Sequence, residues 1–103
     1  MALDRQTIDP STLHDLVNRA VSELAAGYGG VMIDIGNRLG LYRAMADAGP
    51  MTSHEVAQAA GCAERYVREW LNGQAAGGYV VYHPASRTYE LTPEQAAVLA
   101  DET

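Results

Sequence analysis

The sequence predicts a mainly α-helical domain with a small β-hairpin: a winged helix-turn-helix preceded by N-terminal dimerisation helices. Three observations lead to this fold class. Two short helical segments are joined by a glycine-containing turn, two strand-forming segments follow them, and an amphipathic helix precedes them. With 103 residues and a hydrophobic fraction of 48%, the chain is long enough for the core of one domain and too short for two.

The first predicted helix begins at Asp9-Pro10, because Asp is a favoured N-cap and Pro suits the first helical position. A single apolar stripe follows at helical spacing. It consists of Leu13, Leu16, Val17, Ala20, Val21 and Leu24. Gly27 and the pair Gly29-Gly30 are expected to interrupt this helix.

A second apolar segment runs over residues 31–45 and is hydrophobic on more than one face, which predicts the buried centre of the domain. Gly36 and Gly40 within it indicate a bend or two separate helices. Gly49-Pro50 is expected to end it. The segment would therefore connect the N-terminal stripe to the helix-turn-helix.

The helix-turn-helix begins with a capping box, Thr52-Ser53-His54-Glu55, and its first helix is expected to stop at Gly61. A second helix is predicted over residues 64–76, although Ala63 supplies no side-chain cap. Its inward-facing residues would be Val67, Trp70, Leu71 and Ala75. We expect Trp70 to pack in the core rather than to stack on a ligand, because it shares the apolar stripe with Val67.

A hairpin and a last helix complete the pattern. Strand-forming residues at 79–82 and 87–91 flank a turn at His83-Pro84-Ala85-Ser86, which predicts the wing. Thr92-Pro93-Glu94-Gln95 then begins a final helix with a cap and a proline at its first position.

The sequence is thus divided into four parts. They are a flexible N-terminus (1–10), N-terminal helices for dimerisation and core (11–48), the helix-turn-helix plus wing (49–92), and the start of a linker helix (93–103).

Four runs within this pattern, at residues 40–46, 63–71, 76–80 and 89–94, resemble a known domain. It is the N-terminal winged-helix domain of bacterial class I SAM-dependent methyltransferases, a family often labelled transcriptional regulator. Arg65-Tyr66-Val67-Arg68-Glu69-Trp70-Leu71 is the most specific part, and the resemblance covers about residues 11 to 103.

The resemblance implies a non-catalytic domain that pairs two subunits and helps to cover the substrate pocket. SAM would be bound by a Rossmann-like domain that follows. The sequence stops where that domain should start, so we expect either a fragment of a longer protein or a free-standing relative. We therefore expect the parent protein to be a SAM-dependent methyltransferase, with its small-molecule substrate held only when the catalytic domain is present. This chain alone would hold no cofactor and perform no catalysis.

The six-residue stripe is the predicted dimer interface. A winged helix closes its core without an additional amphipathic helix, and a two-fold partner would offer the same stripe in return. The open alternative is that this helix folds back on its own domain.

A different function would be a small winged-helix DNA-binding transcriptional regulator. Its contacts would come from Arg65, Arg68, Asn72 and Arg87. Against it, the net charge is −6, and residues 61–78 sum to zero charge. A DNA-binding helix needs arginines that are not neutralised. Nucleic acid is therefore not the expected partner.

Other candidate chemistry is weak. Gly27-Tyr28-Gly29-Gly30 superficially resembles a nucleotide-binding loop, but no strand precedes it. The three histidines lack partners at metal-ligand spacing, and Cys62 lacks an activating base, so we expect no metal site and no nucleophile. The histidines are His14, His54 and His83.

A third hypothesis is a small-molecule-binding module. The only residues that favour it are three tyrosines, Tyr28, Tyr42 and Tyr82. A single cysteine, the lack of a secretory pattern and the lack of a long apolar run lead us to expect a cytoplasmic protein without membrane attachment.

Overall fold

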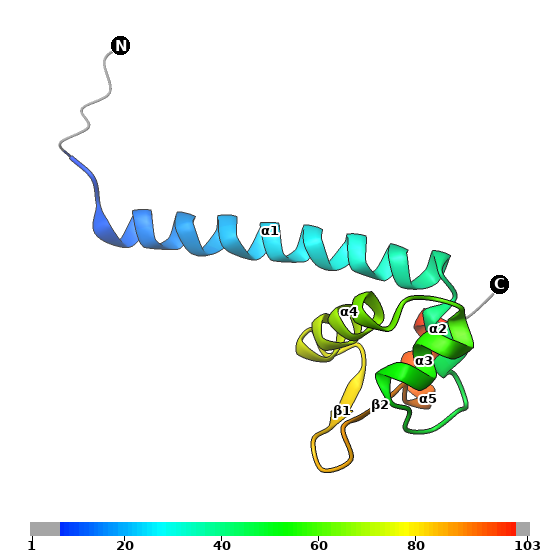
Figure 1. Ribbon diagram of the computed structural model, residues 1–103. Helices are drawn as coiled ribbons and strands as arrows, with labels where there is room; N and C mark the ends of the chain where they lie inside the picture. The colour runs from blue at the N-terminus through cyan, green and yellow to red at the C-terminus, as the bar shows by residue number, and fades with distance from the viewer. Residues whose placement is uncertain (1–6, 101–103) are drawn as a thin grey trace.

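The computed structural model describes residues 7–100 of the chain. Their elements, in order, are α1 (Pro10–Arg38), α2 (Leu41–Met45), α3 (Ser53–Ala60), α4 (Glu64–Ala76), β1 (Val81–His83), β2 (Thr88–Glu90) and α5 (Pro93–Leu99). Figure 1 shows α1 as a long rod whose C-terminal part lies over α4, while its N-terminal part extends away from the other elements. The predicted fold class, mainly helical with one hairpin, is confirmed.

α1 begins where the sequence predicted, because the Asp9 carboxylate accepts hydrogen bonds from the Ser11 backbone N–H at 3.4 Å and the Thr12 hydroxyl at 2.7 Å. The predicted break at Gly27 and Gly29-Gly30 is wrong: the helix continues through them to Arg38. Glycine lowers helix stability by about 1 kcal/mol per residue, but it leaves the backbone hydrogen bonds possible. Most of the N-terminus predicted to be flexible, residues 1–6, lies outside the described residues.

The bend expected at Gly40 is present. Gly40 adopts a left-handed backbone with φ of 74° and separates α1 from α2. The segment 31–45 is not buried throughout, however. Leu41, Tyr42 and Met45 lie in the core, whereas Val31 and Leu39 are more than half exposed. The buried centre therefore begins with α2, after the chain has turned away from the direction of α1.

The helix-turn-helix and wing follow the predicted signals closely. The Thr52 hydroxyl accepts from the Glu55 backbone N–H, the Glu55 side chain accepts from the Thr52 backbone N–H, and Gly61 ends α3 with φ of 70°. α4 begins after Ala63 without a side-chain cap, as expected. In the wing, β1 pairs antiparallel with β2 through the register Val81↔Glu90, Tyr82↔Tyr89 and His83↔Thr88.

The core lies between α2, α3, α4 and the hairpin. Its buried hydrophobic residues are Leu41, Tyr42, Met45, Val56, Ala57, Val67, Trp70, Leu71, Val80, Tyr89 and Leu91. Of the inward-facing residues predicted on α4, Ala75 is only partly buried, and its neighbour Gln74 is buried instead. The Tyr42 hydroxyl donates a hydrogen bond to the Gln74 side-chain oxygen, which explains how an amide is accommodated in this core. Burial raises the pKa of Tyr42 to about 12, so the phenol keeps the proton that it donates.

α1 joins this core at one close crossing with α4. Gly36 is the buried residue of α1, and a Cβ atom there would lie 2.2 Å from Cζ2 of Trp70. The Trp70 indole N–H donates to the Met32 carbonyl oxygen at 2.8 Å, and its ring meets Tyr42 edge-on at 5.0 Å between centroids. Trp70 is thus a core residue, as predicted, and it also fixes the position of α1.

Candidate functional site

The N-terminal stripe of α1 is exposed in the structure. Leu13, Leu16, Val17, Val21 and Leu24 are between 49% and 75% exposed. Ala20, the sixth member, is exposed as well. These residues do not pack on the domain, so the alternative in which this helix folds back on its own core is wrong for the described chain.

The stripe faces a different side of α1 from the residues that approach α4, so it does not continue the surface that packs on the core. At 100° per residue, the six residues centre on a face that lies roughly 120° around the helix from the face carrying Gly29, Met32 and Gly36. Those three are partly or fully buried, and they lie on the side of α1 that approaches α4. α1 therefore has one face for its own domain and a second apolar face that its own domain leaves uncovered.

A cavity of about 250 Å³ opens between α1 and α4, beside this stripe. We call it the α1–α4 groove. Its α1 wall is formed by Tyr28, Met32, Ile35 and Leu39, and Trp70 lies at its base. On the α4 side it is bordered by Tyr66 and Glu69. Its surface is mainly apolar, and Tyr28 and Tyr66 are 67% and 72% exposed.

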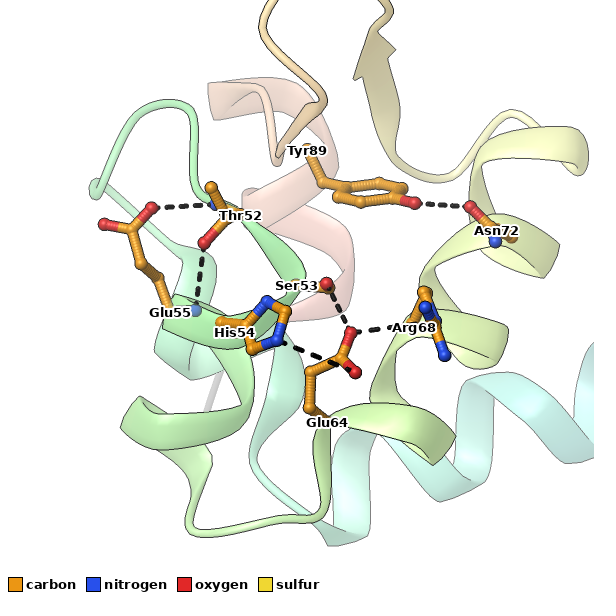
Figure 2. A network of polar contacts seen from close by, with 8 residues as sticks. All are labelled: Thr52, Ser53, His54, Glu55, Glu64, Arg68, Asn72 and Tyr89. Atoms are coloured by element: carbon orange, nitrogen blue, oxygen red, sulfur yellow. Dashed lines mark hydrogen bonds and ion pairs between the residues drawn. The ribbon is translucent and has the colours of Figure 1, made fainter.

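The face of the helix-turn-helix where α3 and α4 meet the wing carries a polar network (Figure 2). The Glu64 carboxylate, at the first residue of α4, accepts a hydrogen bond from the Ser53 hydroxyl at 2.6 Å. Arg68 Nε lies 3.7 Å from the same carboxylate, and His54 Nε2 lies 3.9 Å from it. The hydrogen bond from Ser53 is the largest cause that lowers the pKa of Glu64, so this face carries a fixed negative charge among its basic groups.

Three of the four candidate DNA-contacting residues meet on this face. Arg68, Asn72 and Arg87 line one polar cavity of about 560 Å³, whereas Arg65 is not part of its lining. The Asn72 side-chain oxygen accepts a hydrogen bond from the Tyr89 hydroxyl, as Figure 2 shows, and Arg68 faces Glu64. The two side chains best suited to read bases are therefore engaged within the protein.

The remaining candidates are dispersed. His14 lies within hydrogen-bond distance of Asn18 on α1, and His83 lies 2.9 Å from Glu90 on the wing. Among residues 7–100, no three His, Cys, Asp or Glu side chains form a cluster able to hold a metal ion. Cys62 is partly buried beside the α1–α4 groove, and its thiol donates to the Ala60 carbonyl oxygen at 3.6 Å.

The tyrosines separate into three environments. Tyr28 lines the α1–α4 groove, Tyr42 is buried in the core, and Tyr82 packs against Tyr89 on the wing with centroids 4.9 Å apart. The three tyrosines that favoured a small-molecule-binding module therefore do not share one cavity among the described residues. The glycine-rich segment 27–30 is likewise unfit for SAM, since it lies inside α1, where helical hydrogen bonds use its backbone N–H groups.

Sequence reasoning missed Ser53, Gln74 and Tyr66. Helical periodicity places Gln74 near the inward stripe of α4, three residues after Leu71, and that signal could have found it. The Ser53–Glu64 contact joins residues of different helices, and the role of Tyr66 as a groove wall depends on where α1 crosses α4. Neither has a local sequence signal.

The joined helices α3 and α4 and the hairpin after them define a winged helix-turn-helix domain. The family model described as "Rv2258c-like winged HTH domain" matches residues 27–101, and the chain belongs to that family. No curated protein matches the sequence.

Similar solved structures agree with this assignment. The mitomycin 7-O-methyltransferase MmcR has a TM-score of 0.72 and 21% identity, with 88% of this chain matched to 27% of that one. PigF with SAH has a TM-score of 0.70 and 18% identity over 95% of this chain and 25% of its own. Human N-acetylserotonin methyltransferase in complex with SAM has a TM-score of 0.67 and 16% identity over 94% and 27%.

At these identities the likeness shows the fold alone, and this chain spans about a quarter of the length of the similar structures. The winged-helix domain that the sequence resemblance implied is confirmed. Over the part of the chain that the structure describes, no helix is long and apolar enough to cross a membrane.

Proposed function

We propose that this chain is the non-catalytic N-terminal winged-helix domain of a SAM-dependent methyltransferase, and that it serves dimerisation and covering of the substrate pocket. The observation that carries the dimerisation role is the exposed stripe on α1, which a complete winged-helix core leaves uncovered. The similar structures support the enzyme class, because two of the three are named methyltransferases and the third is named with SAH.

Cofactor and substrate then belong to a separate catalytic domain. The described residues offer neither a strand–glycine-loop site nor a metal cluster, so their contribution is to position subunits and to close a pocket from one side. SAM would supply the methyl group there. The winged-helix domain would act on that chemistry only through placement.

A pair of charge substitutions tests the dimer. Leu16→Glu with Val21→Glu places two carboxylates on the stripe, and we expect the mass in light scattering to fall to that of a folded monomer because buried unpaired charges are strongly unfavourable. Ser22→Glu with Ala26→Glu is the matched control, since it adds the same charges to exposed positions off the stripe. If the unsubstituted chain is a monomer at tens of micromolar, the dimer proposal is wrong.

Calorimetry with SAM tests the assignment of cofactor binding to another domain. We expect no heat of binding from this chain, since its only glycine-rich candidate segment is helical. A micromolar dissociation constant would overturn this assignment and would reopen the segment 27–30 as a site.

DNA binding is the second candidate, favoured by the convergence of Arg68, Asn72 and Arg87 in one cavity. Glu64 at its edge opposes it, because a carboxylate held there by Ser53 would meet phosphate oxygens. Fluorescence anisotropy with a labelled duplex at low salt separates the candidates. Binding that weakens steeply with salt would favour the regulator, and we expect none at micromolar protein.

A further inference from the structure

The exposed apolar face of α1 does not stop at Leu24. It continues along the same side of the helix through Val31 and Ile35, which are 58% and 38% exposed. From Leu13 to Ile35 the face is about 33 Å long at 1.5 Å per residue. Its two halves differ. The N-terminal half is an exposed apolar ridge, whereas the C-terminal half forms one wall of the α1–α4 groove.

We propose that the α1–α4 groove of one copy receives the N-terminal half of α1 from a second copy, and that the two α1 helices run antiparallel about a two-fold axis near Leu24. This inference rests on the proposed dimer and assigns its geometry. In this register Leu13 of one copy lies beside Ile35 of the other, and Val17 lies beside Val31.

Only the antiparallel arrangement covers both halves at once. A two-fold pair of antiparallel helices brings each ridge to the other copy's groove, and the same contact is made twice. A parallel pair would place ridge on ridge and groove on groove, which leaves both cavities open. Antiparallel helix dipoles also attract each other, while parallel ones repel.

The exposed apolar area matches what such an interface needs. The face includes large side chains that are 38% to 75% exposed on α1, and Tyr66 of α4 is 72% exposed. Aromatic side chains present about 150–250 Å² each and the smaller aliphatic ones present less, so the exposed parts of this face amount to roughly 1,000 Å². A stable interface of standard size buries about 800 Å² per partner, and a monomer rarely exposes a contiguous apolar patch this large.

Disulfide crosslinking tests the register on the whole chain with Cys62→Ser, which removes the native thiol. Leu13→Cys together with Ile35→Cys should yield a covalent dimer on mild oxidation. Leu13→Cys alone should yield none, because the two copies of residue 13 lie at opposite ends of the pair. Crosslinking by Leu13→Cys alone would show parallel helices and overturn the proposal.

A second variant tests the groove independently of crosslinking. Tyr66→Asp places a charge on the groove wall, and we expect the dimer dissociation constant to rise at least tenfold. His54→Asp, on the polar face, is the control that should leave it unchanged. Tyr66 and His54 are both exposed, so both variants should fold.

The outcomes distinguish the two proposals. A dimer that neither crosslinks through positions 13 and 35 nor responds to Tyr66→Asp would overturn the groove geometry and leave dimerisation standing. A monomeric chain would overturn both.

Discussion

The two parts of α1 obey different constraints. Residues 29–38 include the crossing with α4, where Gly36 is buried against Trp70 and leaves no room for a Cβ atom. Residues 10–28 have exposed side chains throughout, and a Cβ atom added at Gly27 would meet nothing within 4 Å. The comparison teaches that one helix can be held at one end by its own core, while the side chains of its other end stay exposed and are not constrained by that core.

The largest expected loss of stability comes from a substitution at the contact between α1 and α4. Trp70→Ala removes a buried ring and its hydrogen bond to the Met32 carbonyl, so we expect the free energy of unfolding to fall by about 3–5 kcal/mol. Urea denaturation followed by circular dichroism measures this. Tyr66→Ala, one turn earlier and exposed, should change it by less than about 0.5 kcal/mol in the monomer. Equal losses in the two variants would contradict the comparison.

Two glycine substitutions on the same helix should act in opposite directions. Gly36→Ala forces a methyl group into Trp70, and overpacking of this kind costs about 1–3 kcal/mol. Gly30→Ala meets no atom of the domain and should raise stability by up to about 1 kcal/mol through helix propensity. Thermal melts of the two variants check the prediction, and a destabilising Gly30→Ala would mean that the exposed side of α1 at Gly30 is constrained within the monomer.

The smallest expected effect is a change in how the melting temperature depends on pH, and it arises from a contact within the winged helix. The hydrogen bond from Ser53 lowers the pKa of Glu64 below its ordinary value of 4.5. A carboxylate with a lowered pKa contributes stability that is fully present above the ordinary value and is lost as pH falls through the lowered one. We expect Ser53→Ala to reduce the melting temperature at neutral pH and to flatten its decline in acid below about pH 4.5. An unchanged acid profile would show that this contact contributes nothing.

Local signals in the sequence predicted most of the winged helix. Thr52, Gly61 and Thr92 begin or end helices where their chemistry requires it, and such caps act within a few residues. The predicted break at Gly27, Gly29 and Gly30 is wrong because helix propensity is a weak term, and a helix held in place by its other residues can continue through glycines. The position of the groove, by contrast, depends on the angle at which α1 crosses α4, and no local pattern encodes an angle between distant segments.

Within the described residues, α1 is held by its own domain near its C-terminal end, through contacts with α2 and α4, and this makes the helix a lever. About 26 residues separate Gly36 from Pro10, or roughly 39 Å at 1.5 Å per residue. A rotation of about 10° at the crossing would therefore displace the N-terminal end by roughly 7 Å. Substitutions at Gly36 or Trp70 that shift this contact by a fraction of an ångström would be amplified along the helix. The direction in which the exposed stripe points would then depend on how closely Gly36 packs against the Trp70 indole ring.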